Sequence, residues 1–247
     1  MVQKIIAIGG GDIRKQATLL IDQEIVRISG KLNPKLLFIP TASLDDVGYV
    51  ASITSYFHKL GCVVETLCLI SQNPSITEIK TKILNADIIY VGGGNTLRMM
   101  TLWRKLGFDK LLHQARAQGK VLCGVSAGSI CWFSHGNSDS RKFKNPEADY
   151  IKVTGLGLIP ALHCPHYDSE SARKESLKKM LKNYPGVAIA LEDCTALQVL
   201  DDQYRILVSK SGAKAYQIYW RDGQFYENII PAVQDFRPLN RLLHKSS

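Results

Sequence analysis

The first half of the chain alternates between short apolar runs and longer stretches in which apolar residues recur at helical spacing. The apolar runs predict buried strands at residues 4–8, 35–39, 63–69, 88–91 and 121–125. The stretches between them predict helices at residues 19–28, 47–60, 76–84, 96–103 and 108–118. Strands that are apolar on both faces and alternate with helices are typical of a parallel sheet covered by helices on both sides.

The pattern changes after residue 186. Further strands are predicted at residues 187–191, 197–200, 205–208, 215–220 and 224–230, and Arg221-Asp222-Gly223 is typical of a hairpin turn. We expect these strands to add to the same sheet in antiparallel orientation, and the polar residues from Arg237 onward to be loosely held. No linker, repeat or low-complexity segment divides the chain, so residues 1–247 are expected to form one domain.

The composition is that of an ordinary globular protein, because 45% of its 247 residues are hydrophobic. No apolar run approaches the length that crosses a bilayer. The first residues are typical of a strand and lack the apolar core and cleavage site of a secretory signal. We therefore expect a cytoplasmic protein with no membrane partner.

The net charge of +9 comes from scattered lysines and arginines. A nucleic-acid partner would be favoured by one continuous basic face with interleaved aromatic residues, which the sequence does not show. The six cysteines form no C-x-x-C pair, and no His/Cys cluster has the spacing of zinc ligands. We expect buried, reduced thiols, no metal and no nucleic acid.

The most informative local motif is Gly124-Val125-Ser126-Ala127-Gly128, where the strand 121–125 ends and a helix begins at Ala127 and continues to 133. A serine on such a turn is held above the sheet, with the N-terminus of the helix beneath it. The flanking glycines permit the tight turn. This pattern favours Ser126 as a nucleophile in acyl transfer; the alternative is a turn that merely contains a serine.

A second motif, Gly-Gly-Gly-Asn-Thr at residues 92–96, follows the strand 88–91 and opens a helix. Glycines at this place leave backbone N–H groups accessible. The motif lacks the pattern of a P-loop, so an oxyanion hole is the preferred interpretation, with Gly93 or Gly94 as one donor and Ala127 as the other. A glycine-rich turn without function is the alternative.

The motif Gly9-Gly10-Gly11 also follows a strand and resembles the start of a dinucleotide fingerprint. Arg14 stands where the third glycine of that fingerprint is needed for close packing of helix on strand. We therefore expect no nicotinamide or flavin cofactor.

A nucleophilic serine needs a base and an orienting carboxylate. His166 follows an apolar run at 156–162 and can lie at the end of a strand, but His163 lies only two residues earlier, so the residues alone leave both open. Asp193 ends the strand 187–191 next to Glu192, whereas Asp139 lies in the polar loop 136–140. Asp168 is too near His166 in sequence to be a comfortable partner.

Four blocks in this order resemble the dipeptidase E–cyanophycinase family of serine peptidases: residues 91–96, 124–128, 164–167 and 191–197. The likeness spans residues 5–208. It implies a three-layer α/β/α sandwich with a mostly parallel, flavodoxin-like sheet, similar to class I glutamine amidotransferases, with antiparallel C-terminal strands. It also implies the hydrolysis of short peptides through an acyl-enzyme, without metal or organic cofactor.

By this resemblance Ser126 is the nucleophile and His166 the base. Gly93 or Gly94 and Ala127 form the oxyanion hole. The family divides over the acid: some members match Asp139, and others match Asp193, with Glu192 adjacent. We favour Asp193, because a residue at the end of a strand is held more rigidly than one in a loop.

The substrate is less clearly indicated. Aspartyl dipeptidases carry a Gly-Glu-Thr-Arg block after the histidine, and the segment Glu170-Ser171-Ala172-Arg173 keeps only the arginine. Asn95 and Arg173 are the candidates for substrate binding, and dipeptides with N-terminal aspartate are the class to test. The alternative for Arg173 is a solvated cation on a basic helix.

The sequence therefore predicts a peptidase that acts on short peptides as a monomer or homodimer. Two other functions remain as alternatives. An α/β-hydrolase esterase shares the serine turn but places its acid between serine and histidine, which is not the order found in this chain. A binding protein without catalytic activity on the same scaffold is the other alternative.

Overall fold

The computed structural model describes residues 2–169 and 171–245, and its core is a set of five parallel strands. They lie in the order β1-β5-β4-β2-β3, and every neighbouring pair in that series is parallel. Their bounds are Lys4–Ile8 for β1, Lys35–Ile39 for β2, Val63–Thr66 for β3, Ile88–Val91 for β4 and Val121–Val125 for β5. Apolar side chains on both faces keep β1, β2, β4 and β5 in the interior, whereas β3 lies at the edge of the sheet and is partly exposed.

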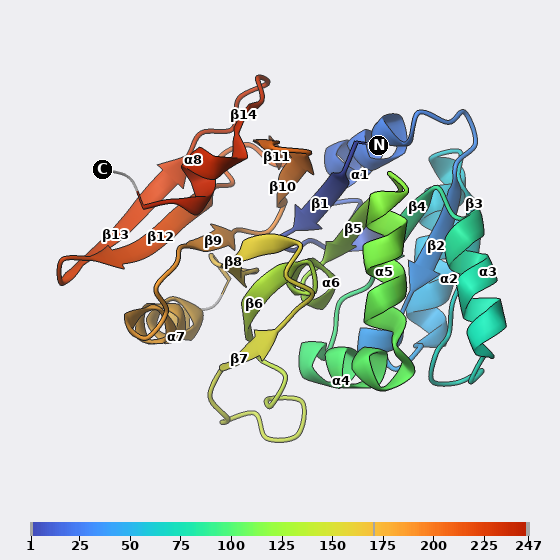
Figure 1. Cartoon of the computed structure of the whole chain (residues 1–247), viewed down its shortest axis with the longest axis horizontal. Coiled ribbons are helices and arrows are strands. Elements are labelled where there is room, and N and C mark those ends of the chain that lie inside the picture. Colours follow the sequence, from blue (N-terminus) through green and yellow to red (C-terminus); the bar gives the residue numbers. More distant parts are fainter. Residues whose placement is uncertain (1, 170, 246–247) are drawn as a thin grey trace.

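Helices cover both faces of this sheet (Figure 1). Since side chains of a strand alternate between faces, Ile6 and Ile8 pack toward α1 and α2, while Ile5 and Ala7 belong to the core shared with α3, α4 and α5. The helices are α1 Leu19–Ser29, α2 Val47–Lys59, α3 Ile76–Asn85, α4 Thr96–Leu106 and α5 Phe108–Ala117. The expected three-layer α/β/α arrangement with a mostly parallel sheet is confirmed.

Local chemistry sets the ends of these helices. Ser75 and Glu78 form a capping box at the start of α3. The Asp46 carboxylate accepts from the Tyr49 N–H at 2.6 Å at the start of α2. Gly107 ends α4 with φ of 66°, in the left-handed region that glycine adopts without strain.

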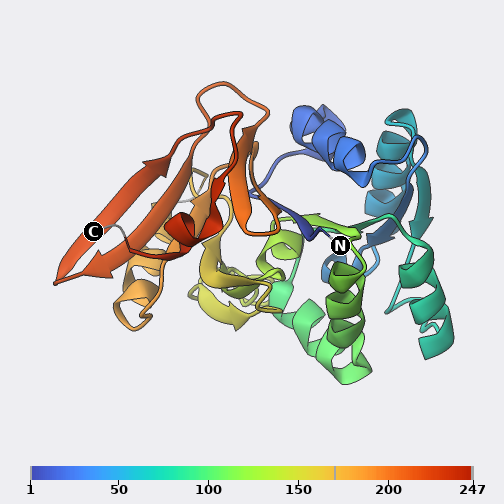
Figure 2. The same ribbon diagram turned by 45° about the horizontal axis from the view of Figure 1, so that its top comes forward.

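A second sheet has the order β13-β12-β9-β8-β6-β7, and it lies with α7 (Ser171–Lys182) on one side of the molecule (Figures 1 and 2). Its strands are β6 Phe133–Ser138, β7 Ile151–Thr154, β8 Ile159–Cys164, β9 Ala188–Leu191, β12 Ala215–Arg221 and β13 Gln224–Ile230. β6, β8 and β9 are parallel neighbours, and the other pairs are antiparallel. Leu177 and Leu181 of α7 pack against one face of this sheet.

The expectation of one sheet for all the late strands was wrong in part. β10 (Thr195–Leu200), β11 (Gln203–Val208) and β14 (Arg237–Pro238) extend the first sheet in antiparallel orientation, as expected. β9, β12 and β13 instead belong to the second sheet. The chain crosses between the sheets in the three residues between β9 and β10, where Cys194 has φ of 64°.

Two other expectations are corrected. The helix after Ser126, α6, is the single turn Ala127–Ile130, because the carbonyls of Cys131 and Trp132 accept from Leu156 and Ile159 and draw the chain into β6. The C-terminal residues are held, because α8 (Leu239–Leu243) buries Leu242 to 2% exposure. No helix in the described ranges has the length and apolarity needed to cross a membrane.

Candidate active site

The end of β1 holds three distant segments together. Its last residue and the two glycines after it present consecutive carbonyl groups, and each accepts from one segment. The Ser126 N–H donates to the Ile8 carbonyl (3.1 Å). The His166 N–H donates to the Gly9 carbonyl (3.2 Å), and the Cys194 N–H donates to the Gly10 carbonyl (2.9 Å). The segments that carry Ser126, His166 and Asp193 therefore meet at the carboxyl ends of the parallel strands, the usual place for a site in such a sheet.

Left-handed backbone occurs in all three segments. Ser126 has φ of 56° and ψ of −113°, His166 has φ of 52°, and Cys194, next to Asp193, has φ of 64°. Residues other than glycine in unfavourable backbone regions cost about 1–3 kcal/mol each and persist where the surrounding structure enforces them. The three hydrogen bonds to the end of β1 supply that enforcement.

Ser126 is forced out of the core by close backbone packing beneath it. A Cβ atom on Gly128 would lie 2.1 Å from the Val91 carbonyl oxygen, and one on Gly124 would lie 2.5 Å from the Gly128 carbonyl oxygen. Between residues 121 and 133, Ser126 is the one residue that is not buried. Its hydroxyl has no hydrogen-bond partner within the described part of the chain, so it is open to a substrate.

His166 and Asp193 form a close pair, with 2.7 Å between His166 Nδ1 and Asp193 Oδ1. Since the carboxylate accepts, Nδ1 carries the proton and Nε2 is left to take another. The hydrogen bond from His166 lowers the pKa of Asp193, which therefore stays ionised at neutral pH. The Asp168 carboxylate accepts from the Asp193 N–H at 3.0 Å and helps to fix this turn.

The two alternative acids face other partners. Glu192 accepts from the Tyr216 hydroxyl and from the Lys214 N–H, each at 2.8 Å. Asp139 lies after β6, with Oδ2 3.7 Å from Nη2 of Arg173. Of the three carboxylates, the structure brings Asp193 to His166.

His163 is a core residue in β8, with 0% exposure. Its Nδ1 donates to the Ile189 carbonyl at 2.9 Å, and its Nε2 lies 2.8 Å from the Ser129 hydroxyl, which also lies 2.7 Å from the Ser126 carbonyl. The ring stacks on Phe133, with centroids 4.3 Å apart. Burial lowers the pKa of His163 to about 3, so the ring stays neutral and links α6 to β9.

The two glycines proposed for the oxyanion hole differ in their hydrogen bonding. Gly93 lies against Ser126, since a Cβ atom on it would be 3.4 Å from Ser126 Cβ, but its N–H donates to the Tyr49 hydroxyl at 3.3 Å. The N–H groups of Gly94 and Ala127 have no acceptor among residues 2–169 and 171–245. These two N–H groups are therefore the unpaired donors among the three that were expected to form the oxyanion hole.

Comparison with known proteins identifies the family of this chain. The model of peptidase family S51 matches residues 5–207, which include Ser126, His166 and Asp193. The chain belongs to peptidase family S51. The uncharacterized peptidase YgaJ of Bacillus subtilis is 34% identical over 233 residues, covering 93% of this chain and 98% of that protein. Peptidase E of Nostoc sp. is 26% identical over 204 residues, covering 76% of this chain and 78% of its own.

Solved structures show the same fold. A peptidase from an acI-B1 actinobacterium superposes with a TM-score of 0.73 at 18% identity, covering 96% of this chain and 97% of its own. A putative peptidase E of Listeria monocytogenes superposes with a TM-score of 0.64 at 24% identity, covering 84% and 99%. The resemblance expected from the four blocks is confirmed, and this S51 protein is a peptidase.

Asn95 of the S51 peptidase, expected to bind substrate, is engaged with the protein itself. It is 6% exposed. Its Oδ1 caps α4 by accepting from the Arg98 N–H at 2.9 Å, and its Nδ2 donates to the Ser140 carbonyl at 2.9 Å. Both ends of the amide therefore hold the loop in place, and a role of Asn95 in substrate binding stays a prediction.

Arg173 is 2% exposed, so it is neither the solvated cation that the alternative expected nor accessible to a substrate in this structure. Besides Asp139, its guanidinium donates to the Asn137 carbonyl at 3.3 Å and lies 4.7 Å from the centroid of the Tyr150 ring. A buried guanidinium needs such partners. Glu170, part of the same predicted segment, lies outside the described residues.

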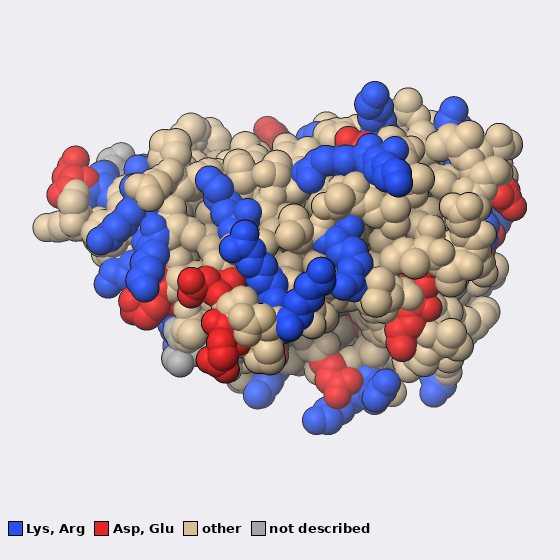
Figure 3. Space-filling view, turned by 90° about the horizontal axis from the view of Figure 1, so that it is seen from below, with Lys and Arg blue, Asp and Glu red and all other residues tan. Residues whose placement is uncertain are grey.

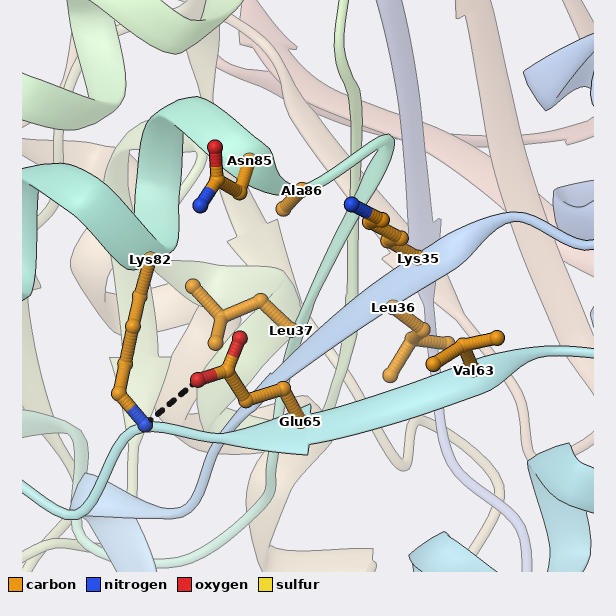
Figure 4. A pocket seen from close by; sticks show the side chains of 8 residues that line it. All are labelled: Lys35, Leu36, Leu37, Val63, Glu65, Lys82, Asn85 and Ala86. Carbon is orange, nitrogen blue, oxygen red and sulfur yellow. Dashed lines mark ion pairs between the residues drawn. The ribbon is translucent and has the colours of Figure 1, made fainter.

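A metal-binding cluster was not found: no three His, Cys, Asp or Glu side chains within the described ranges lie together to hold an ion. A small cavity of about 150 Å³ lies between β2, β3 and α3, and Ser126, His166 and Asp193 do not line it (Figure 4). There Lys82 Nζ lies 2.8 Å from Glu65 Oε1, so one of the two lysines that line the cavity is already paired.

Sequence reasoning missed the role of Gly10. A Cβ atom at this position would lie 1.9 Å from Asp193 Oδ1 and 2.4 Å from His166 Nδ1. The glycine therefore leaves the space that the His166–Asp193 pair fills. The three consecutive glycines after β1 were the available indication.

Proposed function

We propose that this S51 peptidase hydrolyses short peptides with Ser126 as nucleophile, His166 as general base and Asp193 as the carboxylate that orients His166. The 2.7 Å hydrogen bond between His166 Nδ1 and Asp193 Oδ1 is the observation that supports this assignment most strongly. It fixes the tautomer in which Nε2 can accept the proton of a serine hydroxyl. Hydrogen bonds between nucleophile and base are often long without substrate and shorten in its complex.

The reaction follows from these roles. Ser126 Oγ attacks the carbonyl carbon of the scissile peptide bond while His166 Nε2 takes its proton. The N–H groups of Gly94 and Ala127 donate to the oxyanion. His166 returns the proton to the leaving amine, and an ester to Ser126 remains. Water then attacks this ester with His166 again as base, which releases the acid product and restores the serine hydroxyl.

A preference for N-terminal aspartate needs a cation other than Arg173. Lys210 is an exposed cation near the site, and its charge lowers the pKa of Asp193, although less than the hydrogen bond from His166 and the charge of buried Arg173 do. We propose to compare dipeptides that begin with Asp or Asn in the wild type and in Lys210→Gln. A preference for Asp that survives the substitution would exclude Lys210 as its source.

Labelling with a fluorophosphonate tests the catalytic assignment. The wild-type protein should be labelled on Ser126, and Ser126→Ala should be neither labelled nor active. Asp193→Asn should lower kcat by about 10³- to 10⁴-fold, because the amide favours the wrong tautomer of His166. A folded wild-type protein that is neither labelled nor active on any peptide would indicate a binding protein instead.

A further inference from the structure

A groove of about 760 Å³ lies between α4 and the residues 140–148 that follow β6. Apolar Leu97 and Leu102 line it together with four cations, and no Asp or Glu does. The four cations are Arg98, Lys105, Arg141 and Lys144. α4 and the residues after β6 lie at the bottom of Figure 1, and the view from below in Figure 3 shows Lys and Arg side chains gathering in the middle of this face.

The positive charge of the groove is not neutralised by the protein. None of these four side chains forms an ion pair with a residue in the described ranges. Like charges brought together without counterions raise the local potential and attract anionic ligands. Apolar surface beside them favours a ligand that also carries apolar side chains.

The walls of the groove are fixed to each other at one end. The Asn95 amide donates to the Ser140 carbonyl, and the Leu97 N–H donates to the Ser140 hydroxyl, each at 2.9 Å. A ligand therefore meets a groove that is already formed, so little binding energy is lost in ordering it.

The groove begins close to the serine turn. Gly93 lies against Ser126, and Asn95, two residues later, lines the groove. Two steps of about 3.8 Å between Cα atoms separate these residues. An extended peptide advances about 3.3–3.6 Å per residue, so about two residues of a substrate span the distance between these two positions.

We propose that this groove binds an acidic segment, interspersed with apolar residues, of a peptide substrate that is longer than a dipeptide. The carboxylates pair with the four cations while the apolar side chains contact Leu97 and Leu102. This assignment rests on the proposed function, because it takes the scissile bond to lie at Ser126. It gives the peptidase a preference for acidic peptides that Arg173, buried with Asp139, does not supply.

Binding to Ser126→Ala, which cannot cleave, tests the groove without catalysis. The probe is a fluorescein-labelled peptide in which Glu alternates with Leu, and the comparison peptide carries Gln in place of Glu. Lys105→Gln/Lys144→Gln removes one cation from each wall. Lys59→Gln/Lys80→Gln removes the same charge from exposed positions on α2 and α3 and is the matched control.

We expect the Glu-Leu probe to bind more tightly than the Gln-Leu probe. We also expect the groove variant to weaken binding by about 3- to 10-fold, as for the loss of two exposed ion pairs. The control should change it by less than about 2-fold, because screening at ~0.1 M salt limits distant charges to about 10 Å. Equal losses in both double variants, or equal affinities for both peptides, would overturn the proposal.

Two further outcomes separate this proposal from others. Single-stranded DNA that binds as tightly as the Glu-Leu probe would replace it with a general surface for polyanions. Fluorophosphonate labelling of Ser126 without any preference for the acidic probe would leave the proposed function intact and refute the groove. Probe binding as expected without labelling would refute the catalytic role of Ser126 instead.

Discussion

Replacing Gly10 by alanine tests the catalytic pair at its closest contact. The new Cβ would lie 1.9 Å from Asp193 Oδ1 and 2.4 Å from His166 Nδ1, whereas contacts of Cβ below 3.0 Å essentially do not occur. The Asp193 oxygen must therefore retreat by about 1 Å, which a 2.7 Å hydrogen bond does not survive. Gly10 is not among the glycines with positive φ, so alanine adds no backbone strain.

We expect Gly10→Ala to lower kcat by at least about 100-fold, the usual cost of a 1 Å misplacement, and by up to about 10⁴-fold if His166 loses its orientation. The assay measures kcat and KM on a peptide, with circular dichroism to establish folding and the low-field proton resonance of His166 Nδ1–H to follow the pair. The intensity of this resonance and kcat should both decrease in the variant.

Gly48→Ala is the matched control for this experiment. It lies in α2, where an added Cβ would be 3.4 Å from Asp46 Oδ1, an ordinary contact. Alanine in place of glycine in a helix stabilises by up to about 1 kcal/mol, so this variant should keep its kcat and melt at a slightly higher temperature. A folded Gly10→Ala with wild-type kcat would refute the role of Gly10 and of the pair it accommodates.

Three further predictions follow from the same geometry. His163→Ala should lower the free energy of unfolding by about 2–4 kcal/mol in denaturant titrations and leave kcat of the folded protein within about 10-fold. His166→Ala should instead abolish most of kcat and leave the free energy of unfolding nearly unchanged. Asp139→Asn should cost about 1–3 kcal/mol of stability, because a buried guanidinium loses one charged partner, and should spare kcat, unlike Asp193→Asn. Burial raises the pKa of Asp22 from 3.8 to about 7, so its favourable contribution is present below pH 3.8 and is lost as the pH rises through 7. Asp22→Asn should therefore raise the melting temperature more at pH 8 than at pH 5, and an equal rise at both would contradict this.

The parallel core was predictable because its strands are apolar on both faces. The strands at 4–8, 35–39, 88–91 and 121–125 were predicted with the bounds that the structure shows. The second sheet was not predicted. The strands at 187–191, 215–220 and 224–230 were predicted but assigned to the first sheet, and β6 (Phe133–Ser138) was missed because residues 134–138 are polar or glycine.

The candidate site could likewise be predicted only in part from the sequence. Ser126 could be proposed from its own neighbours, because a turn between strand and helix is a local feature. His163 and His166 could not be separated by spacing. What separates them is that β8 ends at Cys164, which leaves His163 inside the strand and His166 beyond it, at the end of β1. That difference depends on the pairing of β8 with β6 and β9.

The glycines after β1 show why the remaining part could not be predicted. A run of glycines after a first strand indicates that something approaches the backbone closely, and in a dinucleotide-binding fold that group is a pyrophosphate. Here the space above Gly10 is filled by the chain's own His166 and Asp193, which come from the ends of β8 and β9. The local sequence specifies the space but not its occupant. The occupant is set by which strand ends the fold places over β1, so the same local motif serves cofactor binding in one topology and supports the proposed catalytic pair in this one.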